Sequence, residues 1–126
     1  MASSSATKFL CLFLILGLAS PILATDYYVG GDKGWNLDVD FKAWVSDKVF
    51  KVGDVLHFIY VPLVHNVGRL VDEAAFLNCL TDPKLIIDAS GSTSVVLNEV
   101  GDFYFCSSVL LDCVSNLKIK ITVSLS

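Results

Sequence analysis

Residues 117–125 read L-K-I-K-I-T-V-S-L and form the most regular alternation of apolar and polar side chains in the chain. Successive side chains of a β-strand point to opposite faces of the sheet, so the five apolar residues of this stretch share one face. The other face carries two lysines, a threonine and a serine. We therefore expect a strand with one side in the core and the other toward solvent.

Shorter stretches of the same kind precede it and are separated by turn-like Gly-Asp pairs. The further predicted strands are Asp26–Val29, Val55–Val61, His65–Val71, Thr93–Leu97 and Phe103–Phe105. Helical signals are short and are confined to Phe41–Val45 and Asp72–Phe76. Short strands with little helix indicate an all-β fold, an antiparallel β-sandwich or barrel with one or two short helices.

The composition excludes two classes of protein. Of the 126 residues, 54% are hydrophobic and 17% are charged, so the chain can bury a core and is not disordered. Nine basic residues against 13 acidic ones give a net charge of −4, with no basic run that could neutralise phosphates. The sequence therefore predicts no nucleic-acid partner. The length fits a single working domain.

The N-terminus has the layout of a secretory signal peptide. Lys8 precedes the uncharged run FLCLFLILGL, and Pro21 breaks this run before the small residue Ala24. We predict a signal peptide over residues 1–24 and a domain over residues 25–126, with no transmembrane segment in the mature chain. Neither a small-residue site with a hydrophobic tail nor a Pro-rich stalk follows the last strand, so we expect a secreted, extracellular monomer without a lipid anchor.

Three cysteines remain after the predicted cleavage: Cys79, Cys106 and Cys113. In an oxidising compartment two of them can pair, and the residues alone allow all three pairings. The remaining cysteine is then a free thiol.

The sequence offers little for hydrolytic chemistry. There are only two histidines, His57 and His65, and no Gly-x-Ser-x-Gly motif that would expose a nucleophilic serine. We therefore do not expect an enzyme. A metal site is the better candidate, because the imidazole of His65 and the thiol of Cys106 together could hold a soft transition metal.

At this point the sequence resembles the phytocyanins, plant blue copper proteins with the cupredoxin fold, over Tyr28–Val123. No single motif is specific, but their order and spacing are. The motifs are Val29-Gly30-Gly31, Gly34-Trp35, Trp44, Phe50-Lys51-Val52-Gly53-Asp54, Leu56-x-Phe58-x-Tyr60, His65-Asn66-Val67, Cys79, and Gly101 through Tyr104-Phe105 to Cys113.

The resemblance implies a Greek-key β-sandwich, a disulfide between Cys79 and Cys113, and copper as the family's cofactor. It places His65 at the first histidine ligand and Cys106 at the copper thiolate. Two ligand positions are substituted: Asp112 stands where the family has its second histidine, and Leu117 stands near the axial ligand. The loop that begins at Cys106 is one residue longer than in the family and lacks its Pro-Gly turn.

The sequence departs from the family a second time around Gly68-Arg69, which adds one residue to a predicted strand and predicts a β-bulge. Three interpretations of the site follow. His57 could replace the missing histidine. Asp112 could bind zinc or copper(II) weakly through oxygen. In the interpretation we favour, His65 caps a loop and Cys106 is a small buried apolar residue.

The favoured interpretation resembles the early-nodulin-like branch of the family, which keeps the fold without the copper. It predicts a secreted module with copper absent or weakly bound, which binds a glycan or another extracellular protein in the cell wall or at the cell surface. The alternative is a copper-binding one-electron carrier with an altered site.

Overall fold

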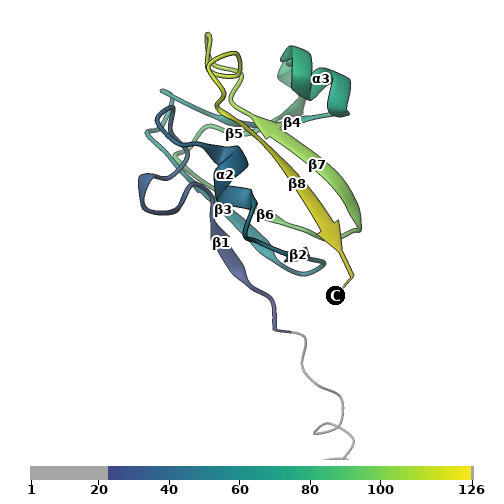
Figure 1. The fold of residues 1–126 in the computed structure, drawn as a ribbon. Helices are drawn as coiled ribbons and strands as arrows, with labels where there is room; N and C mark the ends of the chain where they lie inside the picture. Colours follow the sequence, from purple (N-terminus) through teal and green to yellow (C-terminus); the bar gives the residue numbers. More distant parts are fainter. Residues whose placement is uncertain (1–22, 126) are drawn as a thin grey trace, which may run out of the picture.

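The computed structural model describes residues 23–125, so the predicted signal peptide lies almost entirely outside the described residues. Two β-sheets pack face to face, with two short α-helices at the side of the sandwich (Figure 1). The strands are β1 (Asp26–Tyr28), β2 (Phe50–Lys51), β3 (Val55–Ile59), β4 (Val67–Leu70), β5 (Ile86–Asp88), β6 (Ser92–Val96), β7 (Gly101–Cys106) and β8 (Lys118–Ser124). The helices are α2 (Phe41–Val45) and α3 (Glu73–Asn78), with 3-10 turns η1 (Gly31–Lys33) and η2 (Pro83–Leu85). The predicted all-β sandwich with short helices is confirmed.

The two sheets are mixed rather than purely antiparallel. One has the strand order β1-β3-β6 and the other β2-β8-β7-β4-β5. The pairs β1–β3 and β2–β8 are parallel, whereas the remaining pairs are antiparallel. The expectation of an antiparallel sandwich was therefore wrong for these two pairs. Alternation identifies the buried face of a strand, but it carries no information about the direction of the neighbouring strand.

The predicted alternation of the last strand is confirmed by β8. Ile119, Ile121 and Val123 are buried, and they face a core that both sheets supply. Trp35, Phe58 and Phe105 form the aromatic centre of this core, with ring centroids 5.0 Å apart for Trp35–Phe58 and 5.5 Å apart for Phe58–Phe105. Such pairs stabilise a core beyond the burial of their area.

Strand β7 is covered on both of its faces. Phe103 and Phe105 point into the main core, whereas Tyr104 and Cys106 belong to a second apolar cluster with Leu70 and Ala75. Helix α3 lies beside β4 and β7 on this outer side (Figure 1). Residues 103–106 are all buried because each face of β7 packs against a different apolar cluster. The side chains still alternate between the two faces of the strand.

Both predicted helices are present, and each begins at an aspartate cap. The Asp40 side chain accepts from the Ala43 amide at the start of α2, and the Asp72 side chain accepts from the Ala75 amide at the start of α3. In the part of the chain that the structure describes, no helix is long and apolar enough to cross a bilayer.

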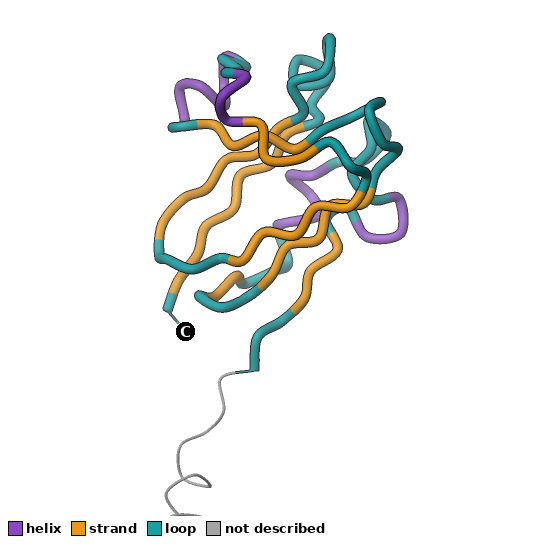
Figure 2. The backbone as a smooth tube through the Cα atoms, turned by 180° about the vertical axis from the view of Figure 1, so that it is seen from behind, coloured by secondary structure: helices purple, strands orange, loops and turns teal. Residues whose placement is uncertain are grey.

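His65 precedes strand β4 instead of lying within it as predicted, because the strand begins only at Val67. The pairing of β4 with β5 shifts register between Val67 and Gly68, next to the predicted bulge. His65 therefore sits in a loop at one end of the sandwich. The loops at this end lie opposite the C-terminus (Figure 2).

Candidate functional site

The site is built by two loops, one before β4 and one between β7 and β8. His65 comes from the first loop, and Ser107 and Asp112 come from the second. His65 Nδ1 lies 2.7 Å from Asp112 Oδ2, and Ser107 Oγ lies 2.6 Å from the same oxygen. All three residues are buried. One carboxylate oxygen therefore joins the two loops inside the protein.

The direction of these hydrogen bonds follows from the partners of Ser107. Its hydroxyl oxygen accepts from the amides of Asn66 and Val109, at 3.3 and 3.4 Å. The hydroxyl proton is therefore available for Asp112 Oδ2. We infer that His65 donates its Nδ1–H to the same oxygen, so this nitrogen carries a proton and presents no lone pair to a metal.

A second pair of hydrogen bonds connects the same two loops. The amide of Asn66 donates from Nδ2 to Ser108 Oγ, and the backbone N–H of Ser108 donates to Asn66 Oδ1, both at 2.8 Å. Trp35 of the core donates its indole N–H to the Asn66 carbonyl at 2.9 Å. The loops are therefore fixed to each other and to the core by polar contacts.

The structure does not bring Cys106 to this network, contrary to the placement implied by the resemblance. Cys106 is a buried free cysteine in the outer cluster, on the face of β7 opposite to Phe105. Burial raises the pKa of its thiol to about 11, although the charge of Lys118 acts in the other direction. At neutral pH Cys106 is therefore a protonated thiol, and the residue that meets His65 and Asp112 is Ser107.

The sequence predicted Cys106 as the ligand because cysteine is the usual copper thiolate, whereas the geometry of β7 selects Ser107. Phe103 and Phe105 are inward-facing, and the next residue on that face is Ser107. If the loop is taken to begin at Ser107 instead of Cys106, it is one residue shorter, and the predicted extra residue relative to the family disappears. The alternation of faces along β7 was therefore the feature of the sequence that could have identified Ser107.

Leu117 lies beside the network but supplies no donor side chain. It is fully buried in the main core, and its backbone N–H donates to the Asp112 carbonyl at 2.9 Å. Its own carbonyl accepts from the N–H of Ser107 at 3.1 Å. These two bonds hold the loop between β7 and β8 closed around Asp112.

His57 is located elsewhere and does not complete the site. It lies in β3, where Nδ1 is 2.9 Å from Ser94 Oγ and Nε2 is 2.9 Å from Asp26 Oδ1. Tyr28 stacks on its ring at a centroid distance of 4.8 Å. Both ring nitrogens are already bonded to residues of the three-stranded sheet. The structure therefore gives no support to a replacement of the second histidine by His57.

The side chains at the site do not fit a blue copper centre. Such a centre uses two imidazoles, a thiolate and a weak axial ligand. Here the corresponding group consists of His65 with Nδ1 engaged, the hydroxyl of Ser107, the carboxylate of Asp112 and the hydrocarbon of Leu117. Within residues 23–125, no three His, Cys, Asp or Glu side chains gather closely enough to hold a metal ion.

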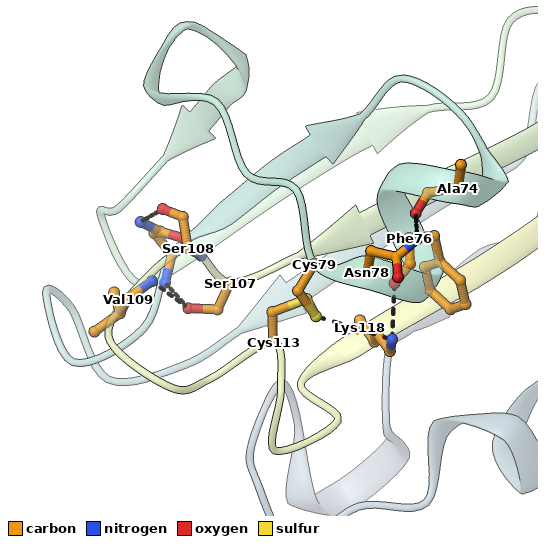
Figure 3. The surroundings of a disulfide bond; sticks show 10 residues. Ala74, Phe76, Asn78, Cys79, Ser107, Ser108, Val109, Cys113 and Lys118 are labelled. Carbon is orange, nitrogen blue, oxygen red and sulfur yellow. Dashed lines mark hydrogen bonds between the residues drawn. A yellow bond between two sulfur atoms is a disulfide. The ribbon is translucent and has the colours of Figure 1, made fainter.

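A disulfide joins the loop between β7 and β8 to the end of α3. The structure places it between Cys79 and Cys113, the pair that the resemblance implied, with a Cα–Cα distance of 5.8 Å. Figure 3 shows the bond with Lys118 beside it. The Lys118 ammonium donates to the Phe76 carbonyl at 2.7 Å and lies over the Phe76 ring. The loop that carries Asp112 is thus tied to the fold on its outer side as well.

Comparisons with known proteins agree with this architecture. Residues 35–117 match the family model of the plastocyanin-like domain. Blue copper protein 1b of Medicago truncatula is 39% identical over 124 residues, which cover 98% of this chain and 76% of that protein. Early nodulin-16 of Medicago truncatula is 30% identical over 128 residues, which cover 98% and 71% of the two chains.

Solved structures show the same fold. The copper(II) structure of cucumber stellacyanin superimposes with a TM-score of 0.75 at 25% identity and covers 82% of this chain and 99% of that one. Cucumber basic protein, a blue copper protein, gives a TM-score of 0.71 at 32% identity, with coverage of 79% and 100%. On this evidence of sequence and fold, the chain belongs to the phytocyanin family of plastocyanin-like blue copper proteins.

Proposed function

We propose that this protein is an extracellular binding module of the phytocyanin family in which a hydrogen-bond network replaces the copper centre. The observation that carries the proposal is the contact of Asp112 Oδ2 with both His65 Nδ1 and Ser107 Oγ. His65 Nδ1, Ser107 Oγ and Asp112 Oδ2 are bonded to one another instead of facing a metal. The site then has a structural role and no redox role.

The network can hold the loops together as a bound metal would. It links the loop before β4 to the loop after β7 through charged and neutral hydrogen bonds in a buried setting. Hydrogen bonds to a charged group are shorter and stronger than those between neutral groups. The described part of the chain has no buried side-chain nitrogen or oxygen without a partner, so the network is complete.

Proteins of this family are electron carriers and not enzymes. A one-electron carrier with an altered copper site is therefore the alternative for this chain. It would need a thiolate at the site, but Cys113 is held in the disulfide, and Cys106, the free cysteine of the described residues, is protonated and faces the outer cluster. Transition metals of the copper type prefer soft thiolate ligands, and a serine hydroxyl does not replace one.

An extracellular location is supported by the predicted signal peptide and by the disulfide, a bond typical of secreted proteins. The hollow beside His65 has a volume of ≈ 160 Å³, smaller than the roughly 300 Å³ at the low end of small-molecule sites. A macromolecular partner in the cell wall or at the cell surface, either a glycan or a protein, is therefore a better candidate than a small substrate.

The copper question is tested on protein secreted from cells that express the full chain. We expect no intense blue absorption and no reversible one-electron reduction after addition of copper(II). The triple variant Ser107→Cys, Asp112→His, Leu117→Met supplies a thiolate, an imidazole and an axial thioether at these positions. We expect it to gain the blue band if the scaffold is intact and only the ligands are substituted.

The matched control is Cys106→Ser, which removes the free thiol on the other face of β7. The proposal predicts that this variant treats copper like the wild type. A blue band in the wild-type protein that disappears in Cys106→Ser would overturn the proposal and establish the electron-carrier alternative.

The class of partner is tested with isolated cell-wall material. Protein retained on the material should be released by glycan-degrading enzymes if the partner is a glycan, and by protease treatment of the material if it is a protein. Retention that neither treatment changes, or no retention at all, would contradict a binding function in the wall.

A further inference from the structure

Large apolar side chains are exposed on the same two loops that carry the network. The exposed fractions of Leu63, Leu110 and Leu111 are 81%, 83% and 69%. With their neighbours they form what we call the loop-end surface, made of Val61, Leu63, Val64, Leu110, Leu111 and Val114. The two loop sequences, VPLVHN and SSVLLDCVSN, contain a single acidic residue, Asp112, and it is buried. The surface is therefore apolar and uncharged in a chain of net charge −4.

Two of these leucines have a backbone conformation that leucine rarely adopts. Leu63 has φ 65° and Leu111 has φ 66°, in the left-handed region that favours glycine and asparagine. A leucine at each loop tip therefore carries a conformational cost that a glycine or asparagine would avoid. Strained residues of this kind persist mainly where the side chain has a function, and both leucines are exposed.

The loops are held in place beneath this surface. The contacts of Asp112 with His65, and of Asn66 with Ser108, connect the two loops directly below their tips. The disulfide of Cys113 fixes the far side of the second loop. A surface that is already rigid loses little conformational freedom on binding, which favours association.

The size of the loop-end surface matches one half of a protein interface. The exposed fractions of its six residues correspond to roughly 700 Å² per copy, against about 800 Å² per partner in a standard interface. The largest apolar patch on a typical monomer is about 300–600 Å². We propose that two copies of this chain associate through the loop-end surface as a two-fold symmetric dimer.

Charge supports a second copy as the occupant. Two acidic chains repel each other where acidic faces meet, but the six residues of the loop-end surface are uncharged, and the charged residue that lines the hollow with Val61 is the basic Lys33. A two-fold axis through it brings the uncharged patch onto itself. This proposal differs from the monomer predicted from the sequence, because that prediction was made without knowledge of the exposed surface.

The test is sedimentation equilibrium of the secreted protein from about 1 μM to 1 mM, a range that spans weak to moderate affinities. We expect the average mass to approach twice the monomer mass as the concentration rises. Leu110→Asp should raise the dissociation constant at least tenfold. The matched control is Val100→Asp, because Val100 is also exposed (55%) but precedes β7 at the opposite end of that strand. It adds the same charge, and its dissociation constant should stay within twofold of the wild type.

A second variant separates association from folding. Leu63→Asn removes an apolar side chain but places a residue that accepts positive φ, so the folded protein should be no less stable while dimerisation weakens at least tenfold. A monomer at every concentration would overturn the proposal, and so would equal weakening by Leu110→Asp and Val100→Asp. Tight capture of a different extracellular protein by a monomer that does not self-associate would also overturn it. Dimerisation and the absence of copper can fail separately, because sedimentation tests the first and the absorption spectrum after addition of copper(II) tests the second.

Discussion

Replacing Asp112 by alanine should destabilise the folded protein through two buried donors at once. Asp112 Oδ2 accepts from His65 Nδ1 at 2.7 Å and from Ser107 Oγ at 2.6 Å, and all three residues are buried. A buried donor without a partner costs about 1–3 kcal/mol. Two such donors lower the expected free energy of unfolding of Asp112→Ala by about 2–6 kcal/mol, a large share of the total stability of a domain.

The Asp112→Asn variant should lose less stability than Asp112→Ala. The asparagine keeps one acceptor oxygen and loses the negative charge, so one donor can remain satisfied through a weaker bond. We expect a loss of about 1–2 kcal/mol for this variant. A double-mutant cycle between Asp112→Ala and His65→Ala should show a coupling of about 0.5–3 kcal/mol, since the two side chains are in direct contact.

The assay is urea unfolding with the disulfide intact, followed by tryptophan fluorescence, because Trp35 is fully buried. Asp102→Ala is the matched control. Asp102 also accepts from a hydroxyl, Thr122 Oγ1 at 2.7 Å, but the pair is exposed and its loss should cost no more than about 0.5 kcal/mol. If Asp112→Ala and Asp102→Ala lose the same small amount, the network does not stabilise the loops and the reasoning is refuted.

Three further predictions concern other parts of the fold. Burial raises the pKa of Cys106 from 9.0 to about 11, so between these values the unfolded chain releases a proton that the folded chain keeps. Stability should fall by about 2–3 kcal/mol as the pH rises through this window, and Cys106→Ala should remove that part of the pH dependence in unfolding titrations. Serine at both Cys79 and Cys113 should lower the free energy of unfolding by about 3–4 kcal/mol, because their sequence separation of 34 makes a long closed loop; a loss below about 1 kcal/mol would contradict this. Alanine at Gly34 would place a Cβ 2.6 Å from the Ile59 carbonyl oxygen at φ 70°, whereas at Gly53 (φ 99°) it meets no atom within 4 Å. The melting temperature should therefore drop further for Gly34→Ala than for Gly53→Ala, and equal drops would mean that the close approach has no cost.

Much of the fold could be predicted from local patterns. The alternation in 117–125 became β8, and the apolar run from Val55 became β3, because each strand buries one face against the other sheet. Strands β2 and β5 were missed, since two or three residues are too few to show a period. The parallel pairs were missed as well, because their direction is set by long connections and not by local sequence.

The site was predictable in part. The resemblance pointed to His65 and Asp112, and the structure brings their side chains together. It also pointed to Cys106, because a cysteine is the expected copper ligand. A count of strand faces from Phe103 and Phe105 selects Ser107 instead. The bond between Ser107 and Asp112 could not be predicted, because it depends on how the loop after β7 folds back.

The most direct test of the central claim is the protonation state of the His65 ring in solution. Two-bond ¹H–¹⁵N correlation spectra of the secreted, ¹⁵N-labelled protein distinguish a protonated ring nitrogen from one that is unprotonated or bound to a metal. We predict that Nδ1 of His65 carries a proton directed at Asp112, and that its signal does not change when one equivalent of copper(I) is added. An unprotonated Nδ1, or a His65 signal that shifts with copper(I), would contradict the claim that hydrogen bonds have replaced the metal.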